Sequence, residues 1–335
     1  MDLDSHYRNR KVLITGGLGF LGSNLALDLA AKGAEITILD SLHHWYGGNH
    51  FNIEPISDRV RLISGDLRDV ELVHEAIEGQ ELVFHIAAQT SHVDSMTSPL
   101  FDVEVNCRGT ILLLEAMKEL APGARLVYAG TRAQIGKLDY TPVDEKHGAF
   151  PVDIYGVNKH AGELYAFVYM NAHGIPATSL RINNSYGPRH QMKHGKYGIL
   201  NWFIRLAMDG GTIRIFGEGN QLRDYNHVDD VTRAFLAAGA SDAAPGQVYN
   251  LGCGDPISFR EMVKAIIETT GSGRYEHVPW PKEREDIEVG DYVADFSKAT
   301  RELEWTPRVP FQKGLEETVA FYREHQVHYW SKQIS

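Results

Sequence analysis

Tyr155 and Lys159 form a Tyr-x-x-x-Lys pair in the run DIYGVNKHAGELY, which has the spacing of a helix. Residues four apart lie on one face of a helix, so the phenol and the ammonium are neighbours. A free phenol has a pKa of about 10, and bringing it near 7 needs about 4 kcal/mol of stabilisation of the phenolate. Because an adjacent cation supplies such stabilisation, we expect Tyr155 to take a hydroxyl proton while hydride leaves the same carbon. The alternative is an aromatic residue beside a surface lysine.

Thr131 stands in the run VYAGTRAQIG, directly after an apolar stretch that predicts a strand. Its hydroxyl could hydrogen-bond the same substrate oxygen as Tyr155 and relay its proton. The alternative is a threonine that caps a turn or a helix.

A glycine-rich run, TGGLGFLGS, follows the first apolar strand and opens a helix, with Phe20 and Leu21 at the helix start. Gly16 permits a tight turn, Gly19 lets the backbone approach a pyrophosphate, and Gly22 allows close helix–strand packing. The pyrophosphate then meets free N–H groups at the positive end of the helix dipole. The pattern predicts a dinucleotide site rather than a simple turn.

Acidic residues at the ends of the next two strands extend this prediction. Asp40 ends the second strand, where a carboxylate accepts both ribose hydroxyls of adenosine and repels a 2′-phosphate, which favours NAD over NADP. Asp66 and Leu67, after the third strand, could lie under the adenine ring. The alternative for Asp66 is the N-cap of the following helix.

Strand and helix patterns alternate through the first 180 residues, and the strands are almost entirely apolar. Such strands predict a parallel sheet covered on both faces, the doubly wound α/β (Rossmann) architecture, with ligands beyond the carboxyl ends of the strands. The expected strands are 12–14, 35–40, 60–64, 82–86, 125–129 and 178–182, and the expected helices are 20–32, 101–120 and 154–173.

The pattern changes near residue 183, where loops lengthen and basic and aromatic residues mix. We expect a cofactor domain over residues 1–182 and a smaller C-terminal substrate-binding domain over 183–335, with 228–251 returning to the main sheet. Within the second part, the loop 187–198 carries Arg189, Lys193 and Lys196. This local positive charge fits a diphosphate, and a solvated loop is the alternative.

The overall charge limits the partners. The chain has 33 Lys and Arg against 44 Asp and Glu, a net charge of −11, so we expect no nucleic-acid polymer and no membrane surface as partner. Two cysteines in 335 residues predict free thiols in a reducing compartment. No apolar run resembles a secretory signal or a membrane span, so the expected location is cytoplasmic.

Taken together, these motifs resemble the extended short-chain dehydrogenase/reductase family, specifically its NAD-dependent nucleotide-sugar epimerases and dehydratases. The resemblance covers almost the whole chain. It rests on an ordered set of runs: TGGLGFLGS, GDLRD, HIAAQTSHVDS, YGVNK, RINNSYGPR, GEGNQLRDYNHVDDV, YNLG and WTPRV.

The resemblance implies roles by position. Thr131, Tyr155 and Lys159 match the catalytic triad. Ala87 and Ala88, followed by Gln89, would line the cofactor. The implied ligands of the nucleotide-diphosphate sugar are Asn184, Arg189, Arg223, Arg284 and Asp291, of which Arg284 is equally consistent with a solvated charge. The resemblance also implies a homodimer formed through the helices 101–120 and 154–173.

One departure from the family pattern narrows the reaction. The 4,6-dehydratases of this family have an Asp-Glu pair after the catalytic threonine, whereas Thr131 is followed by Arg132 and Ala133. Without those acids, the expected reaction is oxidation and re-reduction at one carbon, a 4-epimerisation of a UDP-hexose type of substrate. The alternative is a lyase, a 5,6-dehydratase or a decarboxylase, that uses the same transient C4 oxidation; a net oxidoreductase and a non-catalytic NAD-binding protein are less favoured.

Arg132 and two pairs of histidines are further candidates for the site. Arg132 would stand beside the reacting ring, where it could pair with a 6-carboxylate or serve as a generic polar residue. The pairs His43-His44 and His190/His194 lack carboxylates at ligand spacing, so we expect no metal.

Overall fold

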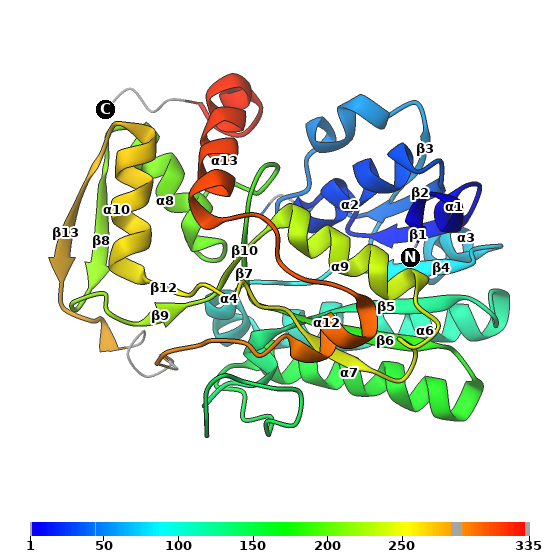
Figure 1. Cartoon of the computed structure of the whole chain (residues 1–335). Helices are drawn as coiled ribbons and strands as arrows, with labels where there is room; N and C mark the ends of the chain where they lie inside the picture. The colour runs from blue at the N-terminus through cyan, green and yellow to red at the C-terminus, as the bar shows by residue number, and fades with distance from the viewer. Residues whose placement is uncertain (1, 44, 283–287, 289, 332–335) are drawn as a thin grey trace.

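The computed structural model describes residues 2–43, 45–282, 288 and 290–331. In this part of the chain a seven-stranded sheet has the order β11-β6-β5-β4-β1-β2-β3, and neighbouring strands run parallel (Figure 1). Its strands are β1 (Lys11–Thr15), β2 (Glu35–Asp40), β3 (Val60–Ser64), β4 (Leu82–His85), β5 (Arg125–Thr131), β6 (Ala177–Ile182) and β11 (Val248–Asn250). This is the doubly wound architecture.

Helices cover both faces of this sheet, because successive strand side chains point to opposite sides. Val12 and Ile14 pack with α2 and α9, whereas Leu13 packs on the other face with α3 and α6. Figure 1 shows α2 and α9 on one side and α6 and α7 on the other. The covering helices are α1 (Leu3–Tyr7), α2 (Phe20–Ala31), α9 (Val228–Ala240) and α12 (Ser297–Leu303) on the first face, and α3 (Val70–Ile77), α6 (Gly109–Leu120) and α7 (Ile154–His173) on the second.

A smaller unit packs beside the carboxyl ends of the strands, at the left of Figure 1. Its core combines residues of α8, α10 and α13 with those of β8. The elements are α8 (Ile199–Met208), β8 (Thr212–Phe216), α10 (Phe259–Thr270), β13 (Arg274–Val278) and α13 (Phe311–His325), with the short pairs β7 (Asn184–Tyr186) with β10 (Tyr225–His227) and β9 (Leu222–Arg223) with β12 (Ile257–Ser258).

The helix expected over 101–120 differs from the observed one. Helical structure begins at Pro99, runs through α5 (Pro99–Val103) and a π turn (Glu104–Arg108), and continues as α6. Proline is well suited to the first turn of a helix, which sets the earlier start. Within the π turn, the buried Asn106 turns its amide to Gln89 and Asp102. The π turn therefore joins this helix to the loop after β4.

Short helices connect these layers: η1 (His50–Ile56), α4 (His92–Thr97), η3 (Arg132–Gln134) and η4 (Gln326–His328). In the described residues, no helix combines the length and the apolarity that crossing a membrane requires.

Candidate functional site

A cavity of about 860 Å³ opens at the carboxyl ends of the central strands. Residues that follow β1, β2, β3, β4, β5 and β6 all contribute to its wall, as the doubly wound topology requires. The smaller unit contributes Arg223 and Trp280 to the same wall. One continuous space therefore spans the glycine-rich loop, the predicted catalytic residues and the smaller unit.

The glycine-rich loop forms a cradle at one end of the cavity. Gly16 has φ +73°, and a Cβ on it would lie 2.9 Å from the backbone of Ala87. A Cβ on Gly22 would lie 2.2 Å from the carbonyl oxygen of Gly16, so this glycine serves packing and does not line the cavity. Helix α2 begins at Phe20, and its N-cap, Gly19, makes no side-chain hydrogen bond to the first turn. The first backbone N–H groups of α2 can therefore bind a ligand. The cavity wall at this point is formed by Gly16, Gly19, Phe20 and Leu21. Such a cradle fits a dinucleotide pyrophosphate.

Asp40 lies in the cavity wall and also holds two backbone segments. Its carboxylate accepts the N–H of Leu18 at 2.9 Å and the N–H of Leu42 at 2.8 Å. Burial raises the pKa of Asp40, and these two hydrogen bonds oppose the rise. Each carboxylate oxygen retains a further lone pair, so Asp40 can accept a ligand hydroxyl while it fixes the loop that holds the glycines.

Asp66 and Leu67 also line the cavity. The Asp66 carboxylate is held by both Nε and Nη2 of Arg68 at 2.8 Å, and these hydrogen bonds lower its pKa. The N-cap of α3 is Asp69, which accepts the N–H of Leu72 at 3.2 Å. The alternative interpretation of Asp66 as that cap is therefore wrong.

The loop after β4 brings Ala87, Ala88 and Gln89 to the wall. The hydroxyl of Thr15 accepts the N–H of Ala87 at 3.1 Å, which ties this loop to the end of β1. Gln89 is buried, and its side-chain amide donates to the carbonyl of Ser91 and accepts the Ser91 N–H, so this side chain is committed to the protein.

Thr131, Tyr155 and Lys159 all line the cavity. The Thr131 hydroxyl hydrogen-bonds the Tyr155 phenol and accepts the N–H of Ala133 at 3.3 Å, so Thr131 also caps η3. The interpretation of Thr131 as a helix cap is therefore confirmed, and its catalytic role stays a prediction. Helix α7 begins one residue before Tyr155, with Asp153 as its N-cap.

Burial governs the protonation of this group. Burial raises the pKa of Tyr155 well above its usual value, and the Thr131 hydrogen bond and the Arg132 charge offset part of the rise. Burial lowers the pKa of Lys159 to about 8, although the Asp102 carboxylate raises it. The ammonium lies 4.2 Å from the centroid of the Tyr128 ring. A phenolate at neutral pH therefore needs positive charge beyond that of the protein, which an oxidised nicotinamide ring would add.

Two residues that the motif analysis did not assign to the site lie beside Tyr155. His92 Nδ1 is 2.5 Å from Asp153 Oδ2, and the His92 ring meets the Tyr155 ring edge-on with centroids 5.1 Å apart. Burial would raise the pKa of Asp153, but the bond with His92 and the Gly156 N–H lower it. The run SHVDS contains His92, yet its partner is 61 residues away in sequence, so spacing alone gives no signal.

The structure places some of the expected substrate ligands in the cavity wall and others outside it. Asn184 and Arg223 line the cavity. Asn184 accepts the Arg132 Nε–H at 3.3 Å, and Arg223 pairs with Glu288. Asp291 is not in the wall, and its carboxylate accepts the N–H of Leu222 at 2.7 Å. Arg284 lies outside the described residues.

Arg189 is also absent from the cavity wall, contrary to the expected ligand role. Its guanidinium donates to Asn24 at 3.1 Å and lies 5.1 Å from the Phe321 ring centroid. Burial lowers its pKa. From the same loop, Lys196 does line the cavity, but it pairs with Asp94 at 2.8 Å. The positive loop is thus occupied by contacts within the protein.

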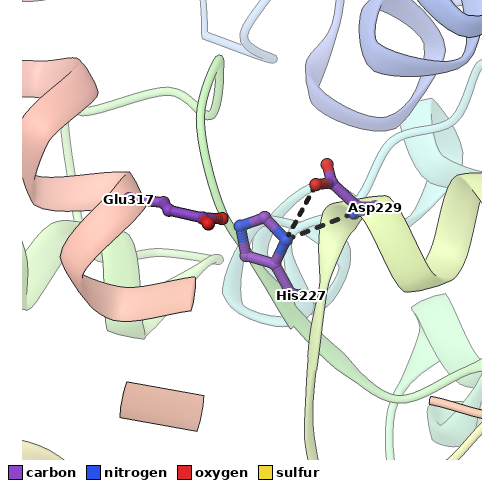
Figure 2. A group of neighbouring side chains, drawn as sticks. All are labelled: His227, Asp229 and Glu317. Atoms are coloured by element: carbon purple, nitrogen blue, oxygen red, sulfur yellow. Dashed lines mark hydrogen bonds and ion pairs between the residues drawn. The ribbon is translucent and has the colours of Figure 1, made fainter. Parts of the chain in front are cut away.

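A separate cluster of His227, Asp229 and Glu317 lies outside the cavity wall, between β10, α9 and α13 (Figure 2). His227 Nδ1 accepts the N–H of Asp229 at 3.4 Å and caps α9. The two carboxylates lie against opposite nitrogens of the ring (Figure 2), and Glu317 also pairs with Lys313 at 3.7 Å. One possible ligand atom from each of the three residues lies within 4.8 Å of the others, a spacing at which such a group could hold a metal ion.

Comparison with known proteins agrees with this geometry. The model of the NAD dependent epimerase/dehydratase family matches residues 12–252. The chain is 33% identical to a dTDP-glucose 4,6-dehydratase of Streptomyces niveus, with 94% of each chain covered. It is 34% identical to a UDP-glucose 4-epimerase of Mycolicibacterium smegmatis, covering 93% of this chain and 98% of the relative. The structure of an epimerase from Methanothermobacter thermautotrophicus superposes with a TM-score of 0.91 at 30% identity, covering 98% of this chain and 96% of the other.

Proposed function

The chain belongs to the NAD-dependent epimerase/dehydratase family, and from that premise we propose that it is a nucleotide-sugar 4-epimerase. The observation that carries this proposal is a catalytic group of Thr131, Tyr155 and Lys159 in one cavity with the glycine cradle. The proposed substrate is a nucleoside-diphosphate hexose, with a UDP sugar as the first candidate. Residues 1–182, with 228–251, would hold the cofactor, and the remainder would hold the sugar nucleotide.

NAD, when bound, supplies a hydride acceptor and donor beside the sugar. Thr131 would hydrogen-bond the 4-hydroxyl and position it against the Tyr155 phenolate, which would remove the hydroxyl proton. Lys159 would stabilise that phenolate by its charge. The transient 4-keto sugar would then rotate in the cavity, so that hydride returns to the opposite face of C4. Tyr155 would return the proton to the inverted hydroxyl, and the reaction is balanced without external reductant.

The residues after Thr131 support epimerisation over 4,6-dehydration. Arg132 and Ala133 occupy the positions at which the dehydratases have an acid pair, and both line the cavity. Removal of water across C5 and C6 needs a base for the C5 proton and an acid for the 6-hydroxyl. A guanidinium and a methyl group provide neither.

Product analysis tests the proposal. The purified holoenzyme is incubated with UDP-glucose, UDP-N-acetylglucosamine, UDP-glucuronate and dTDP-glucose, and products are identified by NMR and mass spectrometry. We expect a 4-epimer of unchanged mass and no net consumption of NAD. The Tyr155→Phe variant should lose at least about 100-fold in kcat and keep its bound NAD. A 4-keto-6-deoxy product, or turnover of the variant at the wild-type rate, would refute the mechanism.

A second candidate, a lyase that uses the same C4 oxidation, is supported by the His92–Asp153 pair. An imidazole backed by a buried carboxylate beside Tyr155 is a second acid–base group in the wall. Such a group could move a proton at C5, as a 5,6-dehydratase or decarboxylase requires. A loss from the sugar of ~18 mass units, for water, or of ~44 mass units, for carbon dioxide, would favour this candidate.

We also propose a homodimer. Helices α5 and α7 pack together and expose apolar side chains, with Leu100 79%, Leu164 49% and Val168 58% accessible. Large apolar residues gathered on adjacent helices indicate a protein interface. A second copy of this chain is the proposed occupant, because both helices belong to the pair that the family resemblance implies.

A further inference from the structure

Arg132 places a positive charge inside the cavity at the sugar end. The residue directly follows Thr131, and η3 fixes its backbone through a capping box between Thr131 and Gln134. Its Nε–H donates to Asn184 at 3.3 Å, and its guanidinium lies 5.5 Å from the centroid of the Tyr292 ring. The side chain is therefore held in place before any substrate arrives.

Several other cations of the cavity wall already have acidic partners, whereas Lys159, at the catalytic group, lies over the Tyr128 ring. Arg223 pairs with Glu288, Lys196 with Asp94, and Arg214 with Glu276. His92 pairs with Asp153. In the described part of the chain, Arg132 makes no ion pair with a carboxylate; its contacts are an amide oxygen and an aromatic ring.

The charge of Arg132 is costly in this setting. Burial lowers the pKa of its guanidinium, and the neighbouring charge of Arg223 lowers it further. A guanidinium away from water is stabilised by an anion that it can bind through two parallel hydrogen bonds. An acidic group of a ligand bound at this position would therefore stabilise the charge of Arg132.

The position of Arg132 relative to the catalytic group identifies which part of a sugar would meet it. If the 4-hydroxyl lies between Thr131 and Tyr155, as the proposed function holds, the substituents next to C4 lie near residue 132. The diphosphate is attached at C1, on the far side of the ring. C6 is attached to C5, the neighbour of C4, and in a hexuronate it is a carboxylate, which is an acidic group at this end of the ring.

We propose that Arg132 binds the C6 carboxylate of the substrate, and that the substrate is a nucleotide-diphosphate hexuronate. This inference rests on the proposed function, because it takes the 4-hydroxyl to lie at Tyr155. A neutral hexose would offer a hydroxymethyl group instead and would leave the half-buried guanidinium without a counter-charge. The site would therefore reject neutral sugars as well as accept acidic ones.

Paired substrates test this inference in the holoenzyme. UDP-glucuronate and UDP-glucose differ only at C6, so the ratio of their kcat/KM values measures recognition of that group. We expect the wild type to favour UDP-glucuronate by about 100-fold or more, since a polar group left unpaired costs that much in discrimination. Arg132→Gln should reduce the ratio by about 100-fold, and Arg132→Lys should recover only part of it, because an ammonium cannot bind a carboxylate bidentately. Arg61→Gln, on an exposed arginine that pairs with Glu75 outside the wall, is the matched control.

Calorimetry adds a readout that does not depend on turnover. Arg132→Gln should weaken binding of UDP-glucuronate and should change the affinity for UDP by much less. An equal loss for UDP would show that Arg132 binds the diphosphate, which overturns the inference. Thermal melting and NAD content establish that the variants are folded.

The failures of the two proposals are distinguishable. Epimerisation of UDP-glucose with no preference for UDP-glucuronate would refute the role of Arg132 and leave the epimerase proposal intact. Conversion of UDP-glucuronate to a pentose, with the preference dependent on Arg132, would support the carboxylate site and refute epimerisation. If no nucleotide sugar is turned over, the proposed function fails, and the relative affinities of the two UDP sugars still decide the inference.

Discussion

The imidazole of His92 and the carboxylate of Asp153 are joined by a 2.5 Å contact at the edge of the Tyr155 ring. Asp153 is buried and caps the helix that carries Tyr155, while His92 reaches the cavity from the first position of α4. The pair therefore connects the start of α7 to the start of α4. It can act on the reaction in two ways: by holding the Tyr155 helix in place and by moving a proton.

Asp153→Asn separates these two roles. Asparagine caps a helix as well as aspartate does, but it removes the charge that faces His92. We expect kcat to fall by about 10- to 100-fold with little change in melting temperature. The matched control is Asp69→Asn, at the exposed cap of α3, which should change neither. Full activity in Asp153→Asn would mean that the carboxylate serves only the helix.

Lys159 gives a prediction for the pH dependence of catalysis. Burial lowers its pKa to about 8, so its positive charge is lost as the pH rises through that value. Because the charge stabilises the Tyr155 phenolate, kcat/KM should fall on the alkaline side with an apparent pKa near 8. Lys159→Arg keeps its charge and should move this fall upward by at least about one pH unit, whatever its maximal rate. A wild-type profile that stays flat from roughly pH 7 to 9.5 would contradict the assignment.

His85 gives a prediction for stability. It is buried between Thr15 and Thr110, and burial lowers its pKa to about 3. Below about pH 6.5 the unfolded chain binds a proton at this histidine and the folded chain does not, so the free energy of unfolding falls as the pH falls. His190, with its pKa lowered by burial to about 4, acts in the same direction.

Replacement of His85 measures this contribution. Between about pH 6.5 and 4, His85→Gln should reduce the slope of unfolding free energy against pH by up to about 1.4 kcal/mol per unit. Chemical denaturation at a series of pH values checks it, with His50→Gln, at an exposed position, as the control. An unchanged slope in His85→Gln would show that this histidine does not contribute to acid sensitivity.

The proposed dimer is tested on α7. Leu164→Glu combined with Val168→Glu puts two charges into an apolar face, so the particle mass from light scattering should fall from twice the chain mass to once. Val327→Glu changes a residue that is 83% exposed on η4 and should leave the mass unchanged. A wild-type chain that is monomeric at all concentrations would refute the proposal.

Local pattern was sufficient for most of the architecture. Val12 and Ile14 alternate with Leu13 across the first strand, and the glycines that follow it cannot carry side chains where they stand. Tyr155 and Lys159 both line the cavity because helical spacing places them on one face of α7. The π turn before α6 escaped prediction, since it depends on Asn106 reaching Gln89 in another loop.

The contacts of charged side chains were harder to predict from the sequence than the roles of the glycines. Arg189, expected at a diphosphate, packs on Phe321 and binds Asn24 instead. A charged side chain is long and flexible, so its partner is set by whichever elements fold against it. The sequence shows where a charged residue stands in the chain, but only the packing of the folded chain shows which residue it contacts.

The sequence by itself therefore determined the doubly wound fold, the glycine cradle and the Tyr155–Lys159 pair, because each depends on spacing within one element or one turn. Only the tertiary structure decided that His92 meets Asp153, that Arg189 lies outside the cavity wall, and that Arg132 lies in that wall without an acidic partner among the described residues. These three facts depend on the packing of segments far apart in the chain, which fixes distance, burial and the pairing of charge.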